Sequence, residues 1–174
     1  MYINKFIPIC VLSLKTSKLI NYKIIHSIAT PIKFIIISEG SHTRLINYKK
    51  KDTTKLQVFQ YQEHKIHKPK RKIRYVWLET SIYTKMTFAR SLWKIKQEDM
   101  DIQKINRQSP IGNSFINNKI DINKNIIELQ YCYCKNFEKS IKSKEIILGK
   151  KYELNYNNKS NIIIQEFFSL NIFI

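Results

Sequence analysis

Two charged side chains lie in apolar surroundings where solubility does not require them. Arg74 opens the apolar run Arg74–Leu78, and Glu166 lies within Ile162–Phe168, the most apolar stretch of the chain. If that stretch is a strand, Glu166 shares one face with Ile164, because alternate residues of a strand point to the same side. A carboxylate among isoleucines is costly unless it is paired, neutralised or in chemical use. Two interpretations follow: a buried Arg74–Glu166 ion pair, or a closed pocket in which Arg74 binds a substrate carboxylate and Glu166 transfers a proton.

The composition makes the arginines informative. The chain has 174 residues and a formal net charge of +18, with 26 Lys and 5 Arg. Ile, Lys and Asn together make up 73 residues, and their codons are rich in A and T, so the lysine excess partly reflects an AT-rich genome. The charge is therefore weak evidence for a nucleic-acid partner. An arginine retained under this bias is a better candidate for planar, bidentate recognition of a carboxylate or phosphate. The five are Arg44, Arg71, Arg74, Arg90 and Arg107.

Other constellations of reactive residues have simpler interpretations. Cys132 and Cys134 face one side of an expected strand, and a single C-x-C pair favours two core thiols over a metal site. His64 and His67 lie in a basic loop, where neighbouring cations disfavour a metal ion. Three glycines cannot build a phosphate-binding Gly-rich loop, and no nucleophile elbow is visible. We therefore expect no metal site.

The basic run Lys65–Lys72 could contact phosphates, and Tyr131 and Tyr133 could stack on bases. We favour the simpler interpretations, a solvated loop for the basic run and ordinary strand alternation for the two tyrosines. No run reaches the roughly 18 apolar residues of a spanning helix, and no small-residue cleavage site follows Phe6–Leu14. We expect no nucleic-acid partner, no membrane span and no signal peptide.

The elements that must position Arg74 and Glu166 indicate a single α+β domain over residues 1–174 with a mostly antiparallel sheet. Alternating or apolar runs predict strands at 56–61, 73–78, 86–93, 126–134, 151–156 and 161–170. Capping signals predict helices at 32–37 and from Ser41 onward. A helix or helical turn is expected at 98–106, and the loop Ser109–Gly112 is expected to start another helix. Solvated loops are expected at 49–55 and 64–72, and residues 1–29 form a poorly defined N-terminal segment.

Four short blocks occur in order along most of the chain. They are Glu39–Leu45 (EGSHTRL), Arg74–Leu78 (RYVWL) with Phe88–Ser91 (FARS) at hairpin distance, Ser109–Gly112 (SPIG), and Glu166 in the last apolar strand. Their order, spacing and strand context resemble the chorismate lyase (chorismate–pyruvate lyase) family, especially its cyanobacterial and plastid-encoded branch.

The resemblance implies a six-stranded antiparallel sheet, with helices and flap-like segments closing over a buried ligand site. It also implies an activity that uses no metal and no cofactor. The substrate, chorismate, is a small dianion that loses its enolpyruvyl group as pyruvate while the ring aromatises to 4-hydroxybenzoate. The product would serve quinone biosynthesis in the plastid stroma, or in the cytoplasm if the gene is not in an organelle. We expect the protein to act as a monomer.

The resemblance also implies roles for individual residues. Arg74 would bind the ring carboxylate, and the backbone around His42 would add an amide donor to it. Ile111 would line the ring, and Glu166 would contact the 4-hydroxyl region and serve the proton transfer. Arg90 replaces a ligand-facing glycine of the enterobacterial enzymes, so it would add a second cation for the enolpyruvyl carboxylate.

The chain departs from the family at one further position. A family arginine in the strand after the Pro-Ile-Gly block aligns with Lys124.

Two alternative functions stay open beside chorismate lyase activity. They are a non-catalytic domain of the same fold that binds a small aromatic acid, and a basic nucleic-acid-binding protein. Effector-binding domains of some bacterial transcription regulators share the fold, but no winged-helix module is apparent at this N-terminus.

Overall fold

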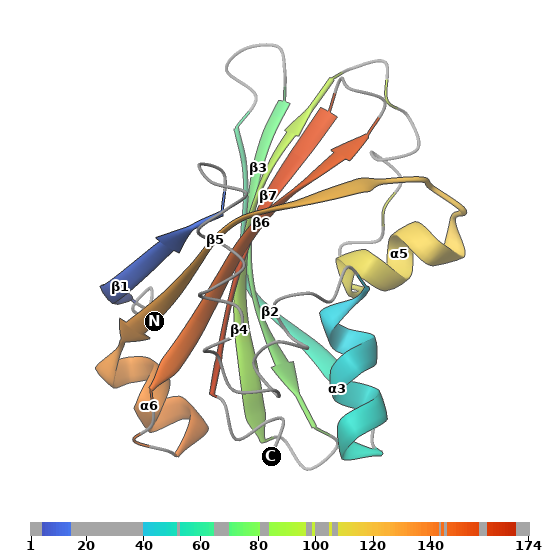
Figure 1. Ribbon diagram of the computed structural model, residues 1–174. Coiled ribbons are helices and arrows are strands. Elements are labelled where there is room, and N and C mark those ends of the chain that lie inside the picture. Colours follow the sequence, from blue (N-terminus) through green and yellow to red (C-terminus); the bar gives the residue numbers. More distant parts are fainter. Residues whose placement is uncertain are drawn as a thin grey trace.

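The computed structural model places its elements in one sheet and three helices within the residues it describes (Figure 1). Those residues are 5–14, 40–51, 53–64, 70–80, 84–96, 99, 105, 108–142, 144, 146–156 and 160–169, without the side chains of 59–64 and 70. The strands are β1 (Ile7–Ser13), β2 (Lys55–His64), β3 (Lys70–Glu79), β4 (Lys85–Ile95), β5 (Asn123–Tyr133), β6 (Ile147–Tyr156) and β7 (Ser160–Ser169). The helices are α3 (His42–Lys50), α5 (Ile111–Asn117) and α6 (Lys135–Ile141).

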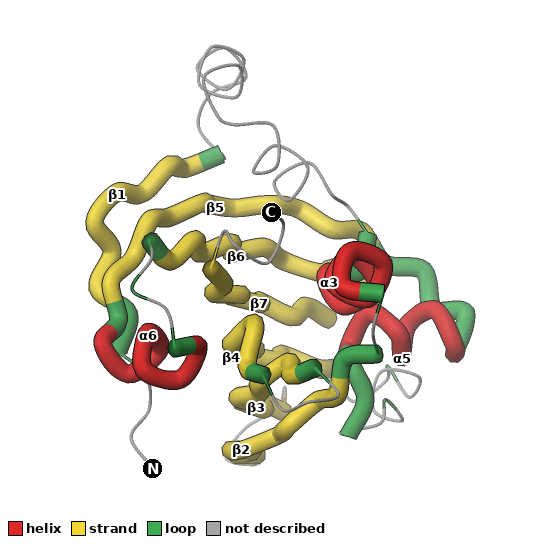
Figure 2. The backbone as a smooth tube through the Cα atoms, turned by 90° about the horizontal axis from the view of Figure 1, so that it is seen from below, coloured by secondary structure: helices red, strands yellow, loops and turns green. Residues whose placement is uncertain are grey.

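The sheet has the order β1-β5-β6-β7-β4-β3-β2, and every neighbouring pair of strands is antiparallel. The last strand in sequence, β7, therefore lies at the centre, between β6 and β4. The sheet is strongly curved; α3 and α5 lie toward one of its faces, and α6 lies on the opposite side (Figure 2). We call the face toward α3 and α5 the front face, and the face toward α6 the back face.

The alternation expected in the last strand is present. Ile162, Ile164 and Glu166 are buried on the front face, and the residues between them point to the back. The register of the central strands extends this pattern across the sheet, because Glu166 pairs with Ala89 of β4 and with Lys150 of β6. Arg74 of β3 pairs with Ser91 of β4, which in turn pairs with Ile164. Arg74 and Glu166 therefore lie on the same face, in adjacent rows and two strands apart.

Apolar side chains fill both faces of the sheet. On the front face, Phe115 of α5 packs in a cluster with Trp93 and Ile164, and Ile46 of α3 packs in a second cluster. On the back face, Phe137 of α6 completes a third cluster. The buried members of the third cluster are Trp77, Phe88, Cys132, Cys134, Phe137, Ile147 and Phe167. The two cysteines are therefore core thiols, as expected, and burial raises the pKa of Cys132 to about 11.

The prediction of six strands is wrong, because β1 adds a seventh at the edge of the sheet, beside β5. The run Ile7–Ser13 shows no polar alternation, since the strand is exposed along most of its length and buries neither face. Helix α6 was also not predicted. Strand β2 ends at His64 and strand β3 begins at Lys70, so both ends of the loop expected at 64–72 are strand, and residues 65–69 lie outside the described residues. The helix predicted at 32–37, and most of that at 98–106, lie outside the described residues.

Candidate functional site

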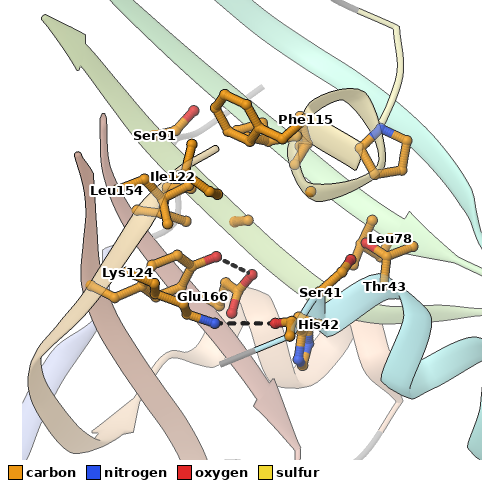
Figure 3. Close-up of a pocket in the computed structure, with 18 of the residues that line it drawn as sticks. Ser41, His42, Thr43, Leu78, Ser91, Phe115, Ile122, Lys124, Leu154 and Glu166 are labelled. Atoms are coloured by element: carbon orange, nitrogen blue, oxygen red, sulfur yellow. Dashed lines mark hydrogen bonds between the residues drawn. The ribbon is translucent and has the colours of Figure 1, made fainter. Parts of the chain in front are cut away.

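A cavity of about 280 Å³ lies between the front face and helices α3 and α5. This volume is close to the lower end of the range for small-molecule pockets, about 300–1,000 Å³. Its walls are mostly apolar, and they come from β2 to β7 and from both helices (Figure 3). The polar side chains that line it are Ser41, His42, Thr43, Arg74, Ser91, Lys124, Tyr152 and Glu166.

Arg74 is the buried cation on the β3 side of the cavity. Only 2% of the residue is exposed, and its Nη2 donates a hydrogen bond to the carbonyl oxygen of Ser109 at 2.9 Å. Ser109 immediately precedes the Pro110 cap of α5. The guanidinium is therefore held between the sheet and the start of α5, where a planar, bidentate donor can meet a carboxylate.

The first and third sequence blocks, Glu39–Leu45 and Ser109–Gly112, meet in the wall of the cavity. Ser41 is the N-cap of α3, and Gly112 lies in the first turn of α5. A Cβ atom on Gly112 would come within 2.8 Å of the Ser41 Oγ, so only glycine allows the two helix starts to approach this closely. The approach places Ile111 and His42, which are far apart in sequence, in the wall of one cavity.

His42 is the first residue of α3 and is 9% exposed. Its Nε2 lies 3.1 Å from the hydroxyl of Thr87, and its ring centroid lies 5.0 Å from that of Phe168. Burial lowers the pKa of His42, and the nearby cations Lys150 and Lys124 lower it further against the effect of Glu166. The imidazole is therefore neutral at pH 7.

Glu166 is the buried acid of the cavity. The residue is 8% exposed, and its carboxylate accepts a hydrogen bond of 2.8 Å from the Tyr152 hydroxyl. Burial, together with this carboxylate, raises the pKa of Tyr152 well above its usual value. Tyr152 therefore remains a hydrogen-bond donor and fixes the orientation of Glu166.

Two lysines flank this acid and tyrosine. Lys150, which is 3% exposed, is next to Glu166 across the β6–β7 pair. Burial, and then the like charge of Lys124, lower its pKa to about 8, although Glu166 opposes the shift. Lys124 donates to the carbonyl oxygen of Gly40 at 3.1 Å, and its Nζ lies 4.5 Å from the Tyr152 ring centroid. Figure 3 shows Lys124, Glu166 and His42 at one end of the cavity.

Four of the five predicted site residues line this one cavity: His42, Arg74, Ile111 and Glu166. The fifth, Arg90, is on the back face. Its Nε donates to the Gln165 Oε1 at 2.5 Å, and its guanidinium lies 5.5 Å from the Phe167 ring centroid. Since Ser91 pairs with Arg74 and points to the front, residue 90 points to the back. The prediction that Arg90 contacts the substrate is not supported by this position.

The alternative of a direct Arg74–Glu166 ion pair is also disfavoured by the geometry. Strands lie about 4.8 Å apart and rise about 3.4 Å per residue, so the two Cα atoms are about 12 Å apart, and an ion pair would need both side chains fully extended toward each other. Arg74 instead donates to Ser109, and Glu166 accepts from Tyr152. The two charges thus lie at separate positions along an apolar slot.

The sequence did not single out Tyr152 or Lys150. Only the register of β6 against β7 places them beside Glu166, and in a Lys-rich chain one more lysine carries little signal.

Residues 29–173 match the family described as Chorismate pyruvate-lyase Rv2949c-like. The chain belongs to this family. The "Uncharacterized protein ycf21" of Antithamnion sp. is 32% identical over 170 residues, which cover 98% of this chain and 93% of the relative. The ycf21 protein of Porphyra purpurea is 31% identical and covers 88% of this chain and 90% of its own length. Because these relatives are plastid-encoded, the expected branch of the chorismate lyase family is confirmed.

Solved structures agree with the α+β fold. The chain is similar to PhnF from Mycobacterium smegmatis, with a TM-score of 0.57 and 4% identity over 79% of this chain and 67% of PhnF. The effector domain of the same protein gives a TM-score of 0.55 and 5% identity over 76% of this chain and 90% of the domain. At such low identity, the likeness concerns the fold alone. Within the described residues, no helix is both long and apolar enough to cross a membrane.

Proposed function

We propose that this member of the chorismate pyruvate-lyase family converts chorismate to 4-hydroxybenzoate and pyruvate. The proposal depends on one observation: a buried arginine and a buried glutamate line the same apolar cavity at separate positions. Arg74 suits a carboxylate, and Glu166, held by Tyr152, suits a proton transfer. The apolar walls between them suit a ring.

Binding begins with the ring carboxylate. Arg74 binds it through charge-assisted hydrogen bonds, which orient the ring and offset the loss of hydration. The N-terminus of α3, at His42, adds the positive potential of a helix start. Ile111 and Ile164 lie among the apolar side chains that enclose the ring and keep water away from it.

The reaction itself needs one positioned base. Glu166 removes the proton from C4 of the ring, and the electron pair of that C–H bond forms a new ring double bond. The bond between C3 and the ether oxygen breaks, and its electrons leave with enolpyruvate, which takes up a proton at its methylene carbon to become pyruvate. The ring is then aromatic, which drives the step, and Glu166 returns its proton to solvent.

A turnover assay tests the proposal. Purified protein is incubated with chorismate, and 4-hydroxybenzoate and pyruvate are quantified by chromatography against the spontaneous rate. We expect the two products in equal amounts, at a rate far above that of buffer. Folded protein that forms no product above the spontaneous rate would retire the enzymatic claim.

A second candidate function is a non-catalytic module that binds a small aromatic acid. The observation that favours it is the fold likeness to an effector domain of PhnF. Under this alternative, 4-hydroxybenzoate binds tightly while chorismate is bound without turnover. The same preparation therefore separates the two functions when binding and product formation are measured together.

The cellular role follows from the product and from the relatives. 4-Hydroxybenzoate is an aromatic ring precursor of the kind that quinone synthesis uses. The plastid-encoded ycf21 relatives support synthesis and action in the plastid stroma. The stromal role predicts that loss of the gene depletes 4-hydroxybenzoate in the organelle and that added 4-hydroxybenzoate restores it.

A further inference from the structure

The basic side chains around the cavity lie on two sides of Glu166. Arg74 belongs to β3, whereas Lys124 and Lys150 belong to β5 and β6, on the other side of β7 in the sheet order. The Nζ atoms of Lys124 and Lys150 lie 4.5 and 5.9 Å from the Tyr152 ring centroid. Both ammonium groups are thus associated with one aromatic ring. We call Lys124, Tyr152 and Lys150 the lysine–tyrosine cluster.

The described side chains around the cavity carry more positive than negative charge. Among the described residues that line it, Glu166 is the one acidic side chain. His42 is neutral at pH 7, because burial lowers its pKa. Lys150, with a pKa of about 8, is still mostly protonated at pH 7. Together with Arg74 and Lys124, these described groups carry a net charge of about +2, which favours a dianion over a monoanion.

We infer that the lysine–tyrosine cluster is a second carboxylate subsite, which makes the cavity select a dianion over a monoanion of similar shape. The inference rests on the proposed function, since it assigns the enolpyruvyl carboxylate of chorismate to this cluster and the ring carboxylate to Arg74. Lys124, which lines the cavity, makes the contact. Lys150, which is 3% exposed and has its Nζ 5.9 Å from the Tyr152 ring centroid, adds positive potential.

The position of Lys124 suits this role. Its ammonium group reaches from β5 to the carbonyl oxygen of Gly40, just before α3, and so spans one side of the cavity. The ether carbon of chorismate is adjacent to the carbon that loses its proton, so the enolpyruvyl group must lie close to Glu166. Figure 3 shows Lys124 beside Glu166. After the reaction, 4-hydroxybenzoate has only the ring carboxylate, because the second carboxylate leaves with enolpyruvate. The subsite therefore contributes to the binding of chorismate and not to that of 4-hydroxybenzoate.

Binding measurements on substrate and product test the subsite. All proteins carry Glu166→Gln to slow turnover, and the Kd values of chorismate and of 4-hydroxybenzoate are measured by calorimetry. Lys124→Met is expected to raise the Kd of chorismate at least about tenfold, because one charged hydrogen bond is lost, while the Kd of 4-hydroxybenzoate changes less than about twofold. Lys124→Arg, which keeps the charge, is expected to retain most of the chorismate affinity.

Lys151→Met is the matched control. It removes a charge of the same kind from β6, at the residue after Lys150. The Nζ of Lys151 lies 3.2 Å from the Glu128 carboxylate, and Lys151 does not line the cavity, so neither Kd should change. Equal weakening of both ligands by Lys124→Met would assign Lys124 a purely structural role and overturn the subsite. Lys150→Met is a second test: we expect it to raise the Kd of chorismate by less than Lys124→Met does, and to leave the Kd of 4-hydroxybenzoate unchanged. A parent protein that binds neither ligand would overturn the proposed function and the subsite with it.

Discussion

Replacement of Arg74 by methionine is the sharpest perturbation of the proposed site. Methionine follows the aliphatic part of the arginine side chain and has no charge, so it fills most of the buried position while removing the guanidinium. A hydrogen bond to a charged group contributes about 1.5–3 kcal/mol, and a carboxylate bound through two of them loses about 3–6 kcal/mol. Since about 1.4 kcal/mol is tenfold, kcat/KM for chorismate should fall by about 10²- to 10⁴-fold.

Two further variants show whether the loss of activity depends on the guanidinium at position 74. Arg74→Lys keeps the charge without the planar fork, so it should fall between wild type and Arg74→Met. Arg90→Met makes the same change on the adjacent strand, but on the back face beside Gln165 and Phe167. It should leave kcat/KM within about threefold of wild type, apart from any loss of stability.

The assay follows product formation at chorismate concentrations well below KM, with the circular dichroism and melting temperature of each variant as a check on folding. A folded Arg74→Met protein with kcat/KM within about threefold of wild type would refute the assignment of the ring carboxylate to Arg74. Equal losses in the Arg74 and Arg90 variants would also refute it, because the effect would then not depend on the cavity.

Three further predictions concern other parts of the site. Glu166→Gln should lower kcat by at least about a hundredfold with little change in chorismate Kd, and an unchanged kcat would remove Glu166 from the proton transfer. Folding lowers the pKa of Lys150 from 10.5 to about 8, so the unfolded chain binds more protons between these values and stability rises with pH across that window. Lys150→Met should remove about 2–3 kcal/mol of the rise between pH 8 and 10 in urea titrations, and an identical pH slope in both proteins would contradict this. Gly112→Val should collide with Ser41, lower stability by about 1–3 kcal/mol and reduce kcat/KM at least about tenfold, whereas Asn117→Val on the exposed end of α5 should not reduce kcat/KM.

The acid and the cation of the cavity could be predicted from the sequence for physical reasons. Glu166 interrupts a run of isoleucines, and strand alternation alone assigns it to the same face as Ile164. Arg74 is conspicuous because lysine is so common in this chain. His42 and Ile111 followed from the resemblance to a family, since nothing in their local sequence indicates a ligand.

The remaining features depend on register, which a single sequence does not specify. Arg90 was assigned to the ligand, but the pairing of Ser91 with Arg74 turns it to the back face. Lys150 is beside Glu166 only because β6 and β7 pair at these residues. Strand β1 escaped prediction because an exposed edge strand needs no alternation of polar and apolar residues.

The most direct test of the account is a crystal structure of the protein with 4-hydroxybenzoate. We predict that the ring lies in the cavity, with its carboxylate on the Arg74 guanidinium and its hydroxyl within hydrogen-bond distance of Glu166. A ligand bound in the reverse orientation, or bound outside the cavity formed by the front face, α3 and α5, would contradict the account.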